Sequence, residues 1–364
     1  MSSLSDQRLA ALRARMTATG TDLVAIGPSS HMMYLAGLDP HGDERPVMLL
    51  VSMSHAGFLM PALNADSSRQ KTSWPLFTWS DDDGPDAALA QLLKASGLPA
   101  TPSVVIDETM RADFALLLLD ALPAARRRFT GDTVGFLRAR KDADEYKRLK
   151  ASAILNDAAA LAGFDALKEG ISELEIAAVI RDHYKQAGAT PVFASVCFAG
   201  NGAFPHHHTG KTKLKRGDAV LIDLGGRLDG YPSDMTRVGF FGEPTEEFQK
   251  VHAIVNRAVE AALAAAKPGV AAKTVDQAAR DVITDAGYGK YFTHRTGHGL
   301  GIDIHEPPYL TATSETVLDE GMVFSIEPGI YLPGQFGLRL EDIVILREEG
   351  PEILSDLPRD AVLR

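Results

Sequence analysis

Hydrophobic positions follow two different spacings along the first third of the chain. Apolar residues recur every three or four positions over three segments, a period typical of amphipathic helices: 6–19, 85–96 and 111–122. Short apolar runs between or beside these segments indicate strands: 23–27, 47–51, 56–60 and 104–107. A further short segment spans 31–35. Strands that alternate with helices predict a small α/β domain.

The pattern changes near residue 137, where a long helical pattern begins. Residues 138–170 contain a pattern that can form one helix of about six or seven turns. We expect this helix to mark the entry to a second domain. The sequence therefore predicts an N-terminal domain at 1–132 and a second domain at 133–364.

The second domain contains an internal repeat. Four residues recur 100 positions later: Ala153, Ile154, Asn156 and Ala158 return as Ala253, Ile254, Asn256 and Ala258. Five more recur 99 positions later: Gly170, Arg181, Asp182, Ala187 and Gly188 return as Gly269, Arg280, Asp281, Ala286 and Gly287. Each copy reads as a long helix, a glycine turn, a second helix and then strands. Ser172 and Glu175 form a capping-box pattern for the second helix of the first copy. Two such units predict a pseudo-symmetric α+β domain with sheets inside and helices outside.

Each copy also carries a pair of carboxylates on a predicted β-hairpin. Asp223 and Asp234 are equidistant from the point between Leu228 and Asp229, a register that pairs them directly. If the turn instead centres on residues 229–230, they become diagonal neighbours on the same face. In the second copy, Glu327 and Glu341 are equidistant from Gly334. We expect both acidic pairs to project from matching places of the repeat.

Four converging carboxylates between apolar strands repel one another and lose hydration, so they must take up protons or bind cations. His298 lies between two glycines, which allow the backbone to approach closely. Four carboxylates and one imidazole suit two divalent ions of the Mn, Co or Zn kind. Such a two-metal centre generates hydroxide at neutral pH and polarises the oxygen of the bond that is attacked.

Composition narrows the class of protein further. A chain of 364 residues holds about two domains at roughly 150 residues each. The single cysteine, Cys197, excludes an intramolecular disulfide framework, and a net charge of −11 argues against nucleic acid or anionic membrane as a partner. The first twenty residues lack the pattern of a secretory signal, and no apolar run approaches the ~20 residues of a membrane span. We expect a cytoplasmic protein.

Five motifs of the second domain resemble those of the pita-bread metallopeptidases. They are IDLG (222–225), SDMTR (233–237), TGHGLGIDIHE (296–306), SIEPGIY (325–331) and LRLED (338–342). Within that superfamily, the M24 family, the chain resembles the Xaa-Pro dipeptidase (prolidase) and aminopeptidase P branch. The N-terminal α/β domain is similar to the creatinase-like domain of that branch. Methionine aminopeptidases share the five ligands but lack this domain, and creatinase shares both domains but lacks the ligands.

The resemblance implies a dinuclear centre and a reaction. Its ligands are Asp223, Asp234, His298, Glu327 and Glu341, of which Asp234 and Glu341 bridge the two ions. A hydroxide between the metals attacks the amide that precedes proline, with Glu327 as general base. The resemblance also implies a homodimer, with manganese, cobalt or zinc as the metal.

Three further residues match functional positions of the family. His206, in FPHHHTG, matches a substrate-binding histidine, whereas we expect His207 and His208 to lie on the surface. His305 matches a histidine that assists catalysis by hydrogen bonding to the carbonyl oxygen. Arg339 matches an arginine that supports the centre and orients a ligating carboxylate.

The residue that selects dipeptides is not apparent from the family pattern. Prolidases of this group often carry an arginine shortly after the HE pair, and the corresponding segment here, HEPPYLTAT, has none. The loop DPHGDERP (39–46) resembles a family loop that reaches the active site. We therefore hypothesise that Arg45, with His41, binds the carboxylate of a dipeptide.

The leading hypothesis is a metal-dependent Xaa-Pro dipeptidase acting on proline-containing peptides. An Xaa-Pro aminopeptidase acting on longer peptides is the alternative within the same chemistry. A non-catalytic pita-bread module that binds peptides is a third hypothesis, but such modules usually lose metal ligands. The same centre hydrolysing a non-peptide amide is a fourth, because a fold does not fix its substrate.

Overall fold

The computed structural model describes residues 4–40, 42–205 and 207–364, and the chain divides into two compact units between Arg138 and Ala139. This division lies a few residues after the predicted boundary at 132/133. The short helix α6 (Val134–Ala139) explains the difference, because its side chains contact the first unit. The guanidinium of Arg15 lies 3.7 Å from the Phe136 ring, and Arg138 lies 3.2 Å from His31.

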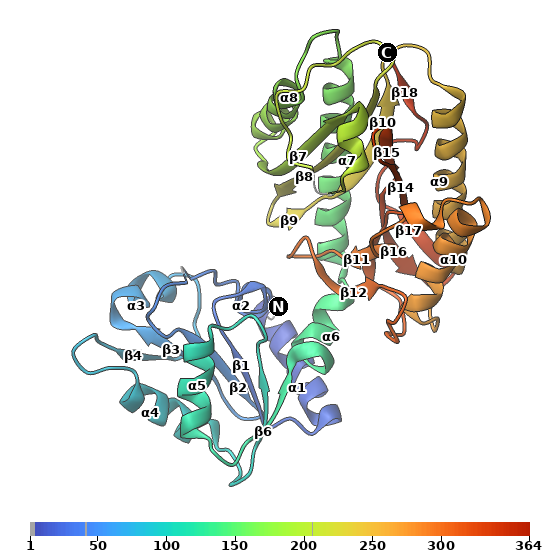
Figure 1. The fold of residues 1–364 in the computed structure, drawn as a ribbon. Coiled ribbons are helices and arrows are strands. Elements are labelled where there is room, and N and C mark those ends of the chain that lie inside the picture. Colours follow the sequence, from blue (N-terminus) through green and yellow to red (C-terminus); the bar gives the residue numbers. More distant parts are fainter. Residues whose placement is uncertain (1–3, 41, 206) are drawn as a thin grey trace. The chain divides into compact units, whose positions relative to one another are not determined.

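The first unit is a six-stranded mixed sheet with helices, as the alternating pattern predicts (Figure 1). The strands are β1 (Leu23–Ile26), β2 (Met48–Ser52), β3 (Ala56–Pro61), β4 (Leu76–Trp79), β5 (Ser103–Ile106) and β6 (Arg126–Phe129), in the order β4-β3-β2-β1-β5-β6. The helices are α1 (Leu4–Thr19), α2 (Ser30–Ala36), α3 (Ala62–Arg69), α4 (Asp86–Ser96) and α5 (Ala112–Ala121). The sequence pattern did not reveal α3, β4 or β6.

The second unit begins with α7 (Ala143–Asp165), not with a helix that starts at residue 138. Asp142 ends the preceding segment by capping α7, since its side chain accepts from the backbone N–H of Asp144 and Glu145. Glu145 completes the capping box. Among the described residues, no helix combines the length and the apolar character that crossing a membrane requires.

The internal repeat is visible in both sequence order and hydrogen bonding. The first copy contains α7, α8 (Glu173–Gln186), β7 (Thr190–Phe198), β8 (Ala219–Leu228), β9 (Tyr231–Pro232) and β10 (Met235–Phe240). The second contains α9 (Glu246–Ala265), α10 (Ala272–Asp285), β11 (Gly297–Gly299), β12 (Glu306–Leu310), β13 (Val323–Ile326), β14 (Gly329–Leu332), β15 (Phe336–Arg339), β16 (Asp342–Arg347) and β17 (Gly350–Ile353). The final strand, β18 (Val362–Leu363), returns to pair with β10 of the first copy.

Equivalent turns of the two copies make equivalent bonds. Gly170 N–H donates to Leu214 O and Gly269 N–H donates to Leu318 O, both at 2.8 Å. Both glycines have positive φ, +80° and +87°, which explains why glycine recurs there. The helix pairs cover the outer faces and the strands lie between them (Figure 1). The predicted α+β repeat is therefore confirmed.

The two acidic pairs lie on hairpins of different regularity. In the β8–β10 hairpin, Asp223 pairs with Thr236, so the turn centres on Asp229–Gly230. Direct pairing of Asp223 with Asp234 is therefore wrong, and the diagonal alternative is confirmed. The second hairpin is interrupted: β13 pairs with β16, and β14 pairs with β15. Glu327 and Glu341 occupy opposite positions at this interruption, in the register that centres on Gly334.

Candidate metal centre and active site

Both hairpins and β11 line one cavity of about 670 Å³ in the second unit. Its acidic and imidazole groups include all five residues that the family pattern marks as ligands: Asp223, Asp234, His298, Glu327 and Glu341. Their ligand atoms form three overlapping groups, each with atoms within 4.8 Å of one another: His298–Glu327–Glu341, Asp223–Asp234–Glu341 and Asp234–His298–His305. The two halves of the repeat therefore contribute to a single cluster.

Burial and mutual repulsion disfavour the ionised form of the carboxylates in this cluster when no cation is bound. Burial raises the pKa of Glu327 to about 7, and Asp223 adds to that shift. Burial and the neighbouring acids raise the pKa values of Asp234 and Glu341 well above their usual range. Burial also raises the pKa of Asp223, against the opposing effect of Arg339. Removing negative charge from water is costly unless protons or cations compensate it.

Asp223 provides a direct test of whether metal ions fit this cluster. Its Oδ2 atom accepts a 2.6 Å hydrogen bond from Arg339. Its Oδ1 atom is buried and has no hydrogen-bond partner among the described residues. Buried carboxylate oxygens are normally satisfied, and an unsatisfied one calls for a missing partner such as an ion. The oxygen-rich donor set with one imidazole fits divalent transition metals.

His298 is prepared to act as a neutral ligand. Its Nδ1 lies 3.1 Å from Gly299 O, so this nitrogen carries the proton and donates to the carbonyl. Its Nε2 faces Glu327 at 3.4 Å and Asp234 at 3.7 Å. Burial lowers the pKa of His298 to about 3, which keeps the Nε2 lone pair available.

The glycines beside His298 are required by close packing. A Cβ atom at Gly297 would collide with the carbonyl of Ser325, and one at Gly299 would collide with the backbone at 306–307. The backbone N–H of His298 donates to Ser325 Oγ at 2.9 Å. Tight contacts on both sides thus fix the position of the imidazole.

The buried side chain of Arg339 links the two hairpins through hydrogen bonds. It donates to Asp223 at 2.6 Å, to Thr236 Oγ1 at 2.9 Å and to Tyr331 Oη at 2.9 Å. Although burial disfavours its charge, Tyr331 and the surrounding carboxylates raise the pKa of Arg339 well above its usual value. Thr236 Oγ1 donates in turn to Glu341 at 2.8 Å. Thr236 and Tyr331 were not predicted, although both lie inside motifs that the sequence displays.

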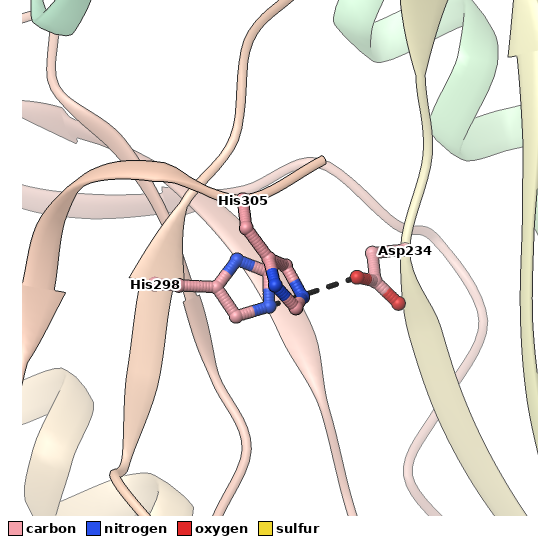
Figure 2. A group of neighbouring side chains, drawn as sticks. All are labelled: Asp234, His298 and His305. Atoms are coloured by element: carbon pink, nitrogen blue, oxygen red, sulfur yellow. Dashed lines mark ion pairs between the residues drawn. The ribbon is translucent and has the colours of Figure 1, made fainter. Parts of the chain in front are cut away.

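His305 lies at the open side of the cluster. Figure 2 shows its ring beside that of His298, with Asp234 opposite, and the two ring centroids are 3.9 Å apart. The next residue, Glu306, is buried and forms a 2.7 Å ion pair with the fully buried Lys141. This pair anchors the backbone that presents His305, and no sequence pattern indicated a role for Lys141.

The remaining predicted residues are placed as follows. His206 and His41 lie outside the described residues. His207 is half-buried and its Nε2 lies 3.2 Å from the buried Glu173, so the expectation that it lies on the surface is wrong. Glu173 also accepts from the backbone N–H of Phe198 and Gly210 and thereby closes the intervening loop. His208 is exposed, as expected.

Arg45 is held within its own unit. Its Nε and Nη2 donate to the two carboxylate oxygens of Asp81, both at 2.9 Å, and its Nη1 lies 3.0 Å from Glu44. This bidentate pair lowers the pKa of the Asp81 carboxyl. Binding of a substrate carboxylate by Arg45 stays a prediction.

Other cavity-lining residues were missed, namely Phe193, His294, Arg295 and Ile304. His294 Nε2 lies 2.7 Å from Tyr331 Oη, which extends the Arg339 network to the cavity wall. The segment HRTG (294–297) immediately precedes His298, so its position beside a proposed ligand was the available signal.

Comparison with known families agrees with this geometry. The family model described as metallopeptidase family M24 matches residues 147–348, and the creatinase/prolidase N-terminal domain matches residues 8–138. The chain is 35% identical to a probable dipeptidase, PepE, of Mycobacterium tuberculosis over 98% of this chain and 96% of that protein. It is also 35% identical to an Xaa-Pro dipeptidase of Lactobacillus helveticus over 94% and 95% of the two chains.

Solved structures show the same similarity over the whole chain. A recombinant prolidase from Thermococcus sibiricus superposes with a TM-score of 0.90 at 34% identity and covers all of both chains. An X-Pro aminopeptidase from Thermotoga maritima superposes with a TM-score of 0.81 at 29% identity, over 96% of this chain and all of that one. These matches confirm the resemblance and the fold class inferred from the sequence.

Proposed function

Because the chain belongs to metallopeptidase family M24, a family of metal-dependent hydrolases, we propose that it hydrolyses the amide bond of Xaa-Pro dipeptides. The observation that carries this proposal is the convergence of four carboxylates and the neutral His298 on one cavity. The relative named Xaa-Pro dipeptidase, which matches nearly the whole chain, supports the choice of substrate.

We propose that Asp223, Asp234, His298, Glu327 and Glu341 hold two divalent ions, with manganese the first candidate and cobalt or zinc the others. When bound, these ions would acidify a coordinated water and polarise the scissile carbonyl. The unpartnered Oδ1 of Asp223 and the raised pKa values of the acids support cation binding at this place.

Glu327 and His305 are proposed to handle the protons and the developing charge. The Glu327 carboxylate, which accepts a 3.1 Å hydrogen bond from Ser325, would take a proton from the attacking water. His305 lies on the open side of the cluster, where its imidazole would donate to the carbonyl oxygen as negative charge develops. The prolyl nitrogen must leave protonated, and Glu327 would return the proton that it took from the water.

The cavity also has apolar walls suited to a proline ring. Phe193, Pro205 and Ile304 line it beside the acidic cluster. The amide before proline has no N–H, so the site needs no acceptor for that nitrogen. His206 would contribute a further contact to the substrate, a role inferred from its motif alone.

A metal add-back experiment tests the proposal. Chelator-treated protein should not cleave Ala-Pro, and added Mn²⁺, Co²⁺ or Zn²⁺ should restore cleavage to alanine and proline. Ala-Ala should be a much poorer substrate. Equal activity before and after metal removal, or no cleavage of any Xaa-Pro peptide with each metal supplied, would contradict the proposal.

Cleavage of longer peptides is a second candidate, favoured by two observations. The segment after the His305–Glu306 pair, PPYLTAT, contains no arginine, although prolidases of this group often carry one there, and the chain also superposes on an X-Pro aminopeptidase. Product analysis on Ala-Pro and Ala-Pro-Ala separates the two functions.

We also propose that the protein is a homodimer, and sedimentation of the purified protein tests this.

A further inference from the structure

The proposed substrate sets an electrostatic requirement on the cavity. In a dipeptide that ends in proline, the free carboxylate is attached to the carbon next to the scissile nitrogen. It must therefore enter the cavity that four acidic side chains already line. A dipeptidase needs a cation there, both to offset repulsion and to distinguish a free carboxylate from a continuing peptide. This requirement on the cavity rests on the proposed function.

Two arginines are among the residues that line the cavity, Arg295 and Arg339. Arg339 is only 5% exposed and donates to Asp223, Thr236 and Tyr331, so its guanidinium is already committed. Among the described residues, the Arg295 guanidinium forms neither an ion pair nor a hydrogen bond, and its side chain is half-buried at the cavity wall.

Tyr309 supports the guanidinium of Arg295. The Arg295 Cζ atom lies 4.7 Å from the centre of the Tyr309 ring, within the range of a cation–π contact. Tyr309 is the strand partner of His298 across the β11–β12 ladder, so the stacked pair is tied to the proposed metal ligand. An arginine stacked on an aromatic face keeps its planar edge available for two parallel bonds to a carboxylate.

The backbone around Arg295 is also fixed. Its carbonyl oxygen accepts a 2.7 Å hydrogen bond from His294 Nδ1, and the next residue, Thr296, donates its N–H to Leu310 O at 3.1 Å.

We propose that Arg295, oriented by Tyr309, binds the C-terminal carboxylate of the dipeptide substrate and thereby sets the substrate length. Tyr309, on the strand that follows the His305–Glu306 pair, is then a platform for an arginine that lies just before β11. Arg45, whose guanidinium is bound by Asp81, is not required for this contact.

The first test compares substrates with and without the carboxylate. Wild-type enzyme should prefer Ala-Pro over Ala-prolinamide. Arg295→Ala should lower kcat/KM for Ala-Pro about 30- to 100-fold, mainly through KM, because a charged hydrogen-bond partner is lost. The same variant should change kcat/KM for Ala-prolinamide less than about threefold. Arg295→Lys should recover part of the loss, since it keeps the charge without the planar fork.

Tyr309→Leu gives an intermediate check, because it removes the ring but not the guanidinium. We expect KM for Ala-Pro to rise about two- to fivefold, the range of an exposed cation–π contact. Arg257→Ala, on the exposed face of α9, is the matched control and should leave both substrates unaffected.

The second test measures binding without turnover. L-Proline carries the carboxylate and pyrrolidine does not, so calorimetry should show that Arg295→Ala weakens proline binding and leaves pyrrolidine binding unchanged. Equal losses for Ala-Pro and Ala-prolinamide, or a carboxylate-specific loss in Arg45→Ala but not in Arg295→Ala, would overturn the proposal. These results differ from a failure of the proposed function, in which wild-type enzyme would cleave neither substrate.

Discussion

The two hairpins that supply the acidic cluster differ in how they are built and in how they are held. In the Asp hairpin, the unbroken strand β8 pairs with both β10 and β9, and Asp234 lies in the gap between these two strands as the diagonal neighbour of Asp223. The Glu hairpin is interrupted at Glu327 and Glu341, between the β13–β16 and β14–β15 ladders. The Asp hairpin is therefore broken in one strand only, at Asp234, whereas the Glu hairpin is broken in both strands, at Glu327 and at Glu341.

Each hairpin restrains an acid of the other. Arg339 of the Glu hairpin donates to Asp223, and Thr236 of the Asp hairpin donates to Glu341. Arg237 of the Asp hairpin makes a second link away from the cavity, to Asp342 at 2.7 Å and to Glu341 O at 2.6 Å. The acidic cluster therefore forms only where the two copies of the repeat meet, because neither hairpin alone supplies all of its acids.

The largest expected effect comes from removing one acid of each hairpin. Asp234→Asn and Glu341→Gln should each lower kcat for Ala-Pro by about three orders of magnitude or more, because both acids are proposed to hold both ions. Bound Mn²⁺, measured by elemental analysis, should fall in both variants. Asp229→Asn, in the exposed turn of the Asp hairpin, is the control and should keep full activity.

A loss confined to one hairpin would contradict this symmetry. If Asp234→Asn were inactive while Glu341→Gln kept more than about a tenth of wild-type kcat, the two copies would not share the metal ions.

The two linking arginines should separate stability from activity. Arg237 and Asp342 are both buried, and Arg237 also donates to Leu357 O. In Arg237→Met, Asp342 keeps its 2.7 Å pair with Arg359 but loses its other charged partner, and buried carbonyl groups lose their donor. We expect the free energy of unfolding to fall by about 2–3 kcal/mol, measured by urea denaturation. Arg339→Met should instead lower kcat or metal affinity about 10- to 100-fold, since Arg339 orients Asp223.

We expect Arg237 to act mainly on stability and Arg339 mainly on activity, and the reverse result would contradict this distinction. A large activity loss in folded Arg237→Met protein with wild-type metal content, beside wild-type activity in Arg339→Met, would show that the cavity is not organised through Arg339.

Several of these features could be predicted from the sequence, because they depend only on the spacing of residues along the chain. The Gly334-centred register, the flanking glycines of His298 and the repeat of Gly170 at Gly269 all follow from spacing. Strand β6 was missed because its sequence, RRRF, shows no apolar alternation, and α3 was missed because it buries only Ala65 and Ser68.

Contacts between distant segments were not predictable in the same way. Lys141 and Glu306 are separated by 165 positions, and Thr236 and Glu341 by 105. Nothing in the local pattern of either residue indicates its partner. The register of the Asp hairpin also depended on the turn, where Asp229 and Gly230 both take positive φ.

The stability of the metal-free protein should depend on pH through the buried acids of both hairpins. Burial raises the folded-state pKa of Glu327 from 4.5 to about 7, so folding favours its protonated form. The resulting stability is complete below pH 4.5 and is lost as the pH rises through 7. As the pH rises from below 4.5 to above 7, the free energy of unfolding should fall by about 3 kcal/mol through Glu327 alone. Asp234 and Glu341 shift in the same direction.

Urea denaturation of chelator-treated protein at pH 5 and pH 8 measures this dependence. Glu327→Gln should make this dependence smaller but not abolish it, since Asp234 and Glu341 still contribute, and Mn²⁺ should reverse it by binding the ionised acids. Higher stability of the metal-free protein at pH 8 than at pH 5 would contradict the account.

The smallest effect concerns the helices behind the hairpins. Ser172 caps α8 of the first copy, whereas the equivalent Ala271 leaves α10 of the second copy without a side-chain cap. Ser172→Ala should cost about 1 kcal/mol of unfolding free energy, and Ala271→Ser should gain up to about 1 kcal/mol. Thermal denaturation of both variants checks this, and a shift of the same sign in both would contradict it.

The central claim is that the two copies jointly hold two metal ions that the hydrolysis of Xaa-Pro dipeptides requires. The most direct measurement titrates metal-free protein with Mn²⁺ and follows bound metal and Ala-Pro cleavage in the same samples. We predict that cleavage rises with binding and reaches its plateau at two ions per chain. Full cleavage without bound metal, or two bound ions without any cleavage, would contradict the account.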